Sequence, residues 1–134
     1  MPISLNNVFG IHETALRLRA QRTELLASNL ANADTPNYKA KDIDFQAAMK
    51  KAAAGYSAGS LKTTHAGHMS GSVAAAGGEF VKFRVPTQPA LDGNTVESHV
   101  EQAAFARNAM EYQATLKFVD GKSKSIIKAI KGES

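Results

Sequence analysis

Apolar residues recur at intervals of three and four near the start of the chain, which is the spacing of one helix face. The stripe consists of Val8, Ile11, Ala15, Leu18 and Leu25, widened by Phe9, Leu16, Leu26 and Leu30. After Gly10, no glycine or proline interrupts this segment. The sequence therefore predicts a long amphipathic helix that runs from Leu5 to Asn32.

A second apolar stripe lies near the end of the chain. Its members follow spacings of three, four and seven residues, and we call them the C-terminal seam: Phe105, Ala109, Tyr112, Leu116, Val119, Ile126 and Ile130. Acidic residues come early in this segment and lysines late, a polarity that suits the helix dipole. Gly121 is a weak point, because glycine costs about 1 kcal/mol relative to alanine inside a helix.

Two pairs of residues mark the expected start of this second helix. Asn94 with Glu97, and Ser98 with Glu101, both fit an N-cap that is followed three residues later by glutamate. We therefore expect a C-terminal helical region over residues 94–134, with the helix itself ending near Lys131.

The region between the two helices, residues 33–93, has a mixed pattern. Asp34-Thr35-Pro36-Asn37 signals a turn, because proline disfavours helix in the residue before it. Residues 45–54 fit a short helix, and residues 79–85 alternate between apolar and polar as a short strand does. Residues 55–78 are rich in Gly, Ala, Ser and His, a composition typical of a flexible loop.

The expected fold is therefore mainly α. It has an N-terminal assembly helix (1–32), an irregular middle region (33–93) with a flexible loop and a short β segment, and a C-terminal assembly helix (94–134). The two long helices are expected to pair as a coiled coil. A two-helix pair leaves much of each apolar stripe uncovered, so further helices from other copies of the chain are expected to cover them.

Composition narrows the function classes. The chain has 134 residues, a net charge of +4 and no cysteine, which excludes disulfides and thiolate metal sites. Its lysines lack the arginine cluster and interleaved aromatic residues of a nucleic-acid site, so a solvated lysine face is favoured. A basic nucleic-acid-binding adaptor remains the alternative, and it predicts a steeply salt-dependent affinity. The first residues lack a secretion signal pattern, and no apolar run is long enough for a bilayer.

Several short motifs suggest chemistry but lack its structural setting. Residues 55–59 match the G-x-S-x-G string of a hydrolase nucleophile, which would make Ser57 the nucleophile of a small hydrolase. That motif requires a strand before it and a helix after it, and neither is predicted here. Residues 121–123 resemble the end of a phosphate-binding loop, but they continue a helical repeat.

Two further groups of residues could be read as metal or acid–base sites. His65 and His68 lack a third ligand, and Asp42 with Asp44 fits an exposed surface turn better than an acid–base pair. We therefore expect no catalytic residue, no cofactor and no metal site, and hence no enzyme.

Residues 27–38 are far more specific, and they resemble the N-terminal signature of bacterial flagellar rod and hook proteins. The signature reads Ser-Asn-Ile/Leu-Ala-Asn, then Thr-Pro, then usually Gly-Tyr. Asn37 replaces the glycine, and asparagine is the next best residue for left-handed backbone geometry. The resemblance makes these six residues an assembly motif: Asn29, Ala31, Asn32, Thr35, Pro36 and Tyr38.

The signature residues also have a physical interpretation of their own. Asn29 and Asn32 lie where the first helix is expected to end, so their amides can satisfy orphan carbonyls or bind the turning chain. Pro36 forces the chain out of the helix. Tyr38 offers a ring and a hydroxyl that can dock the turn onto a helix.

A second segment narrows the resemblance to the proximal rod proteins of this family. Residues 86–97, followed by Asn108 and Tyr112-Gln113, are similar to that group, although Glu97 stands where aspartate is common. Residues 19–22 and 41–45 also resemble the corresponding segments of this group. The resemblance covers about residues 5–50 and 83–131. A different rod subunit of the same family is the alternative, and residues 91–97 argue against it.

The resemblance implies a structural, non-catalytic subunit of the proximal rod. Such a subunit is exported through the flagellar type III apparatus without a cleavable signal, and it assembles in the periplasmic space at the basal body. Its terminal helices build a helical drive shaft that transmits torque. The implied partners are copies of itself, FliE-like and FlgC-like rod neighbours, and the inner-membrane ring. Neither nucleic acid nor direct lipid binding is expected.

Overall fold

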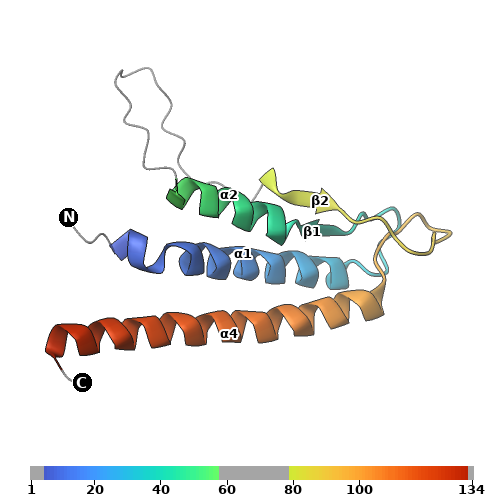
Figure 1. The fold of residues 1–134 in the computed structure, drawn as a ribbon. Coiled ribbons are helices and arrows are strands. Elements are labelled where there is room, and N and C mark those ends of the chain that lie inside the picture. Colours follow the sequence, from blue (N-terminus) through green and yellow to red (C-terminus); the bar gives the residue numbers. More distant parts are fainter. Residues whose placement is uncertain (1–4, 58–78, 133–134) are drawn as a thin grey trace, which may run out of the picture.

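The computed structural model describes residues 5–57 and 79–132, which form three helices and a two-stranded sheet. The elements follow the order α1 (Leu5–Ala31), β1 (Lys41–Ile43), α2 (Phe45–Ser57), β2 (Val81–Phe83) and α4 (Ser98–Lys131). Helix α1 lies between α4 on one side and α2 with the sheet on the other (Figure 1). The mainly helical fold with two long terminal helices is thus confirmed.

Helix α1 begins and ends close to the predicted boundaries. It contains a bend at Gly10, where the backbone leaves helical geometry. Of its apolar stripe, Ala15, Leu18 and Leu26 are buried. These three residues are buried because α1 is the central element and packs against a neighbour on each side (Figure 1).

The hydrophobic core lies between α1, α2 and the sheet. Leu18, Ile43 and Ala48 form its centre. Partly buried apolar residues pack around them: Leu25, Phe45, Met49, Phe80 and Val81. Among the described residues, four of the seven buried apolar side chains are alanine, so the core removes little apolar area from water. A core of this kind stabilises the single chain only modestly.

The small sheet joins two segments that are far apart in the sequence. Strands β1 and β2 are antiparallel, with Ile43 opposite Val81 and Lys41 opposite Phe83. The alternation over residues 79–85 correctly predicts β2. Strand β1 was missed because only Ile43 of its three residues is apolar, so it shows no alternation of apolar and polar residues. The predicted loop at residues 55–78 needs one correction, because its first three residues belong to α2. The remainder of that loop lies outside the described residues.

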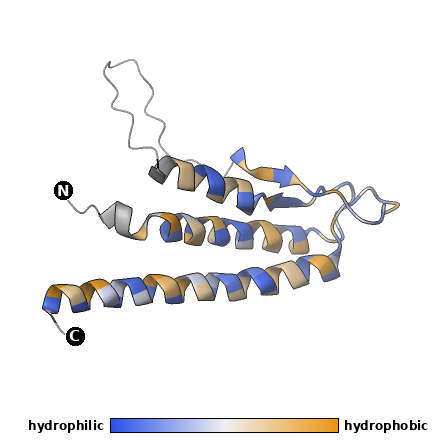
Figure 2. Ribbon diagram, in the orientation of Figure 1, coloured by the Kyte–Doolittle hydropathy of each residue, from blue (hydrophilic) through white to orange (hydrophobic). Residues whose placement is uncertain are grey.

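Helices α1 and α4 pair along their length in antiparallel directions, so the predicted coiled-coil pairing is confirmed (Figure 1). The residues that α4 buries are polar, however: Glu101, Asn108 and Thr115. Apolar residues lie along the whole helix in Figure 2, and several are exposed. None of the described helices is both long enough and apolar enough to cross a membrane.

The predicted N-caps of α4 are wrong. The helix begins at Ser98, four residues after Asn94, and Glu97 at the cap position makes no side-chain cap hydrogen bond. The Glu97 carboxylate accepts hydrogen bonds from Thr87 instead. The predicted capping role fails because tertiary partners compete successfully for these side chains.

Replacing Gly121 with alanine should stabilise the C-terminal half of α4. A Cβ at Gly121 would meet no atom within 4 Å, so the substitution gains helix propensity without a clash. We expect a gain of up to about 1 kcal/mol, seen as roughly fivefold slower amide exchange in the flanking turns. Ala114→Gly, also exposed on α4, is the matched reverse control. Unchanged exchange in both variants would contradict this prediction.

Candidate assembly site

The end of α1 is held by side chains of the signature itself. The Asn32 side-chain amide donates a hydrogen bond to the Ser28 carbonyl (2.8 Å), which also accepts one from the Asn32 backbone N–H (3.2 Å). The Thr35 hydroxyl donates to the Asn32 side-chain oxygen (3.1 Å). The turn after α1 is therefore fixed locally.

Asn29 connects three elements. Its side chain is fully buried, and its amide nitrogen donates to the Lys41 carbonyl (2.8 Å) and to the Glu101 carboxylate (3.1 Å). Its side-chain oxygen accepts a hydrogen bond from the Lys41 backbone (3.1 Å). One asparagine thus ties α1 to β1 and to the first turn of α4.

The turn after α1 reverses the chain and lies against a distant loop. Asn37 adopts a left-handed backbone (φ 61°), as predicted, and its N–H donates to the Asp92 carbonyl (2.9 Å). The Tyr38 hydroxyl lies 3.2 Å from the Ser28 hydroxyl, and the Tyr38 carbonyl accepts from the Thr95 backbone (3.0 Å). These contacts dock the turn onto both α1 and residues 92–95.

Asn94 caps the end of α1 from that distant loop. Its side-chain amide lies 2.7–3.0 Å from three carbonyls, those of Asn32, Ala33 and Thr35. The residue is only 4% exposed. Asn94 therefore serves a helix terminus, but it is the C-terminus of α1 rather than the predicted N-terminus of α4.

The neighbouring glycine allows this close approach. Gly93 has φ 75°, and a Cβ there would lie 2.6 Å from the Asn37 side-chain oxygen. The two segments that carry the sequence resemblance, residues 27–38 and 86–97, are therefore one structural unit. We call this contact between residues 29–38 and residues 92–95 the clasp.

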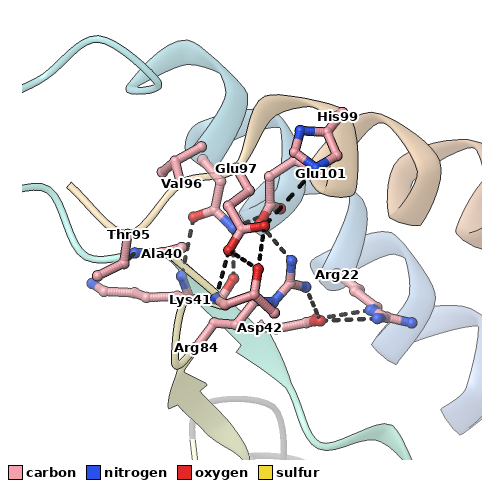
Figure 3. A network of polar contacts seen from close by, with 12 residues as sticks. Arg22, Ala40, Lys41, Asp42, Arg84, Thr95, Val96, Glu97, His99 and Glu101 are labelled. Carbon is pink, nitrogen blue, oxygen red and sulfur yellow. Dashed lines mark hydrogen bonds and ion pairs between the residues drawn. The ribbon is translucent and has the colours of Figure 1, made fainter. Parts of the chain in front are cut away.

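A network of charged residues lies beside the clasp, and Figure 3 shows how its members converge. Arg22 donates two hydrogen bonds to the Asp42 carboxylate (2.8 and 2.9 Å). Arg84 bridges Asp42 and Glu101. The network thereby links α1, β1, the residue after β2, and α4. Glu101 is fully buried, so these donors replace the water that its carboxylate loses.

The charges of this network stabilise one another. Burial acts to raise the pKa of Asp42, but the hydrogen bonds from Arg22 and Arg84 outweigh it and hold that pKa below its usual value. The hydrogen bond to Asp42 raises the pKa of Arg22. Asp42 and Arg22 are therefore charged at neutral pH.

The C-terminal seam is only partly covered in the single chain. Phe105, Tyr112, Val119 and Ile126 are half-buried, whereas Ala109, Leu116 and Ile130 are exposed. Next to the seam runs an open groove of about 430 Å³ between α1 and α4. Ala20, Thr23 and Glu24 line it from α1, and Ala109, Tyr112 and Gln113 line it from α4.

The motifs that suggest chemistry lie in other settings. Ser57 is the last residue of α2, so a helix precedes it where a nucleophile elbow requires a strand. Residues 121–123 are helical within α4. Asp42 and Asp44 have separate cationic partners. His65 and His68 lie outside the described residues, and elsewhere no cluster of three or more metal-ligand side chains occurs among the described ones.

Sequence reasoning missed the roles of Asn94, Arg84, Asp42 and Glu101. The sequence does indicate a turn at Asn94, because this residue follows Asp-Gly, a typical turn pair. Nothing in the sequence marks Arg84 and Asp42 as members of a charged network, because isolated charges beside short apolar runs occur on most protein surfaces.

The comparison with known proteins agrees with this geometry. Residues 9–39 match the family described as "Flagella basal body rod protein". The chain is 48% identical to the flagellar basal body rod protein FlgB of Cereibacter sphaeroides (strain ATCC 17029 / ATH 2.4.9), over 92% of this chain and 94% of the relative. It is 44% identical to FlgB of Aeromonas hydrophila over 99% of both chains, and 38% identical to FlgB of Escherichia coli (strain K12) over 94% of both.

Asn94→Ala should destabilise the chain by about 1–2 kcal/mol, because three carbonyls in the turn after α1 lose their side-chain donor. Urea unfolding followed by circular dichroism measures this difference. Gln88→Ala, exposed in the same loop, is the control and should change stability by less than about 0.5 kcal/mol. Equal effects of the two substitutions would show that the clasp does not support α1.

Asp42 should contribute to stability at neutral pH and lose that contribution in acid. Its folded pKa is depressed, so the unfolded chain binds the proton more readily as pH falls through about 4. The stability difference between the wild-type chain and Asp42→Asn should therefore be largest near pH 7 and shrink below pH 4. Urea unfolding across this pH range measures it. A difference independent of pH would contradict the ionised network.

Proposed function

Because this chain belongs to the FlgB family of flagellar basal body rod proteins, we propose that it is a proximal rod subunit that assembles with copies of itself through its terminal helices. Membership assigns the chain a structural role in the flagellar basal body, in a family that is structural rather than enzymatic. The relatives that match nearly the whole chain carry the FlgB name, which favours this subunit over a neighbouring rod protein.

The exposed apolar surface of α4 is the observation that carries the proposal. Polar residues occupy the buried positions of this helix, so large apolar side chains face solvent. They are between 43% and 80% exposed: Met110, Leu116, Phe118, Ile127 and Ile130. Large apolar side chains exposed along a helix typically mark a protein contact. Other copies of the same chain supply helices of matching length and pattern.

The groove beside the seam supports helix–helix packing between copies. Its walls carry small side chains, Ala20 on α1 and Ala109 on α4, which leave room for an incoming side chain. Packing of this kind inserts a side chain of one helix between residues of its neighbours. Burying Leu116 or Ile130 in such a contact is worth about 1.5–3 kcal/mol each. Repetition over many copies makes the resulting tube stiff enough to transmit torque as a drive shaft.

The signature residues fit a supporting role in assembly. Asn29, Asn32 and Tyr38 hold the turn within the chain. Ala31, Thr35 and Pro36 are exposed at the end of α1, where a neighbouring subunit can contact them. We assign these neighbours to further copies, to FliE-like and FlgC-like rod proteins and to the inner-membrane ring.

The small core supports export without a cleavable signal through the type III apparatus. A narrow channel requires an unfolded chain, and a core in which alanine predominates is readily unfolded. The absence of cysteine means that no disulfide would obstruct passage or form in the periplasm. The rod then supplies the apolar contacts that the single chain lacks.

Leu116→Asp combined with Ile130→Asp should abolish rod formation and leave the isolated chain folded. Both side chains are exposed in the single chain, so the cost of burying charge appears only in the assembly. Complete basal bodies are counted in cells that carry the variant, and circular dichroism checks the purified chain. Normal rods from this variant would show that the seam is not the assembly surface.

The matched control places two aspartates on a different side of the same helix. Ala106→Asp with Ala114→Asp adds the same charge at exposed positions away from the seam and from the other exposed apolar side chains. This control should retain more complete basal bodies than the seam variant. Equal loss would mean that assembly does not use the seam specifically.

A further inference from the structure

The buried side of α4 carries a ladder of polar residues at a fixed interval. Glu101, Asn108 and Thr115 are 0%, 1% and 7% exposed, and each is seven residues from the next. Seven residues are two helical turns, so the three side chains lie in one row along the side of α4 that faces α1. We call this row the polar ladder.

Two members of the polar ladder bind α1 directly. Glu101 accepts a hydrogen bond from the Asn29 amide (3.1 Å). The Asn108 amide donates to the Arg19 carbonyl (3.0 Å) and to the Thr23 hydroxyl (2.9 Å). The Thr115 hydroxyl instead donates to a carbonyl of its own helix (2.8 Å). Glu101 and Asn108 are therefore the two members whose contacts can fix the position of α4 along α1.

Further contacts follow the same antiparallel register. Arg19 pairs with Glu111, and the His12 ring lies near the Phe118 ring. From Glu101 to Phe118 and from Asn29 to His12, the separation is 17 residues on each helix. The two helices thus keep one register from the clasp to the first turns of α1.

The apolar seam alone cannot define that register. Phe105, Tyr112, Val119 and Ile126 repeat every seven residues, and so do Ala109, Leu116 and Ile130 apart from Ser123. If α4 slides by seven residues, most apolar side chains of the seam are replaced by another apolar side chain, and Ser123 takes the place of Leu116. The apolar contacts of the native and the shifted pairing are therefore similar.

The polar ladder does distinguish the two pairings, because its members differ chemically. A shift by seven residues replaces Glu101 with Asn108, which removes the carboxylate that Arg84 binds. It also replaces Asn108 with Thr115, which has no amide to donate to α1. Both changes leave buried polar groups without partners, which is costly in a dry interface.

We propose that Glu101 and Asn108 specify the register of α4 along α1. This register in turn sets where the exposed apolar side chains lie along the axis of the helix pair, and rod assembly requires that position. The second half rests on the proposed function, with another copy of this chain as the partner. A single polar residue at a buried coiled-coil position is known to select register at a cost in stability. The polar ladder acts in the same way within one chain.

Distance measurement by electron paramagnetic resonance tests the register. The chain has no cysteine, so nitroxide labels can be attached at Ala20→Cys on α1 and Lys124→Cys on α4, both exposed. Dilution with unlabelled chain restricts the signal to distances within one molecule. The wild-type chain should give one distance. Glu101→Gln with Asn108→Leu should add a second population shifted by about 10 Å, the length of seven helical residues.

Controls separate a change of register from general damage. Gln102→Leu adds an apolar residue to the exposed side of α4 and should leave a single distance. Asn108→Leu alone keeps the charged network, and the Thr23 hydroxyl still donates to the Arg19 carbonyl. This single variant therefore tests the register if the double variant does not fold. A single native distance in every folded ladder variant would overturn the proposal.

Basal-body counts test the link to assembly. Cells with Asn108→Leu should contain at least tenfold fewer complete rods than cells with Gln102→Leu. Shifted distances together with normal rod numbers would refute the link between register and assembly. The distances come from the isolated chain, so they stand even if the seam variant Leu116→Asp with Ile130→Asp shows that self-assembly through the seam is wrong.

Discussion

The buried carboxylate of Glu101 is the constraint on which the fold depends. A charge removed from water needs donors around it, and these come from Asn29 in α1 and Arg84 after β2. Asp42 in β1 then partners Arg84 and Arg22. Segments up to 72 residues apart in the sequence are thereby brought to one point. The apolar core beside them is small, so this network defines how the helices and the sheet meet.

The same constraint leaves the apolar surface of α4 uncovered. A helix pair can bury only one side of each helix, and on α4 that side is taken by the polar ladder, residues Glu101, Asn108 and Thr115. Several large apolar side chains of α4, among them Leu116 and Ile130, then face solvent, where a monomeric protein gains nothing from them. Such an arrangement is wasteful for a single folded chain and useful for a subunit whose neighbours cover it. In the proposed rod, contacts between copies supply the stability that the monomer lacks.

Periodicity predicted the elements well and their partners poorly. The two long helices and β2 were predictable because their apolar spacing is local information. The buried side of α4 was not, because the apolar stripe shows where a helix can bury area but not which neighbour covers it. Glu101 fitted a capping pattern equally well, and only the position of Arg84 decides between the two roles. Asn94 likewise caps a helix that ended more than 60 residues earlier.

The clasp changes what the family signature is expected to do. Asn29, Asn32 and Tyr38 use their side chains within the chain, and Asn94 covers the carbonyls at the end of α1. These polar groups have little capacity left for a neighbouring subunit. Under the proposed function, contacts between subunits at this end use the exposed Ala31, Thr35 and Pro36. The signature thus acts first within the chain, where its contacts hold the end of α1 next to the start of α4. A helix pair held at that end and kept in register by the polar ladder presents its apolar seam as one rigid surface, which a torque-bearing assembly requires.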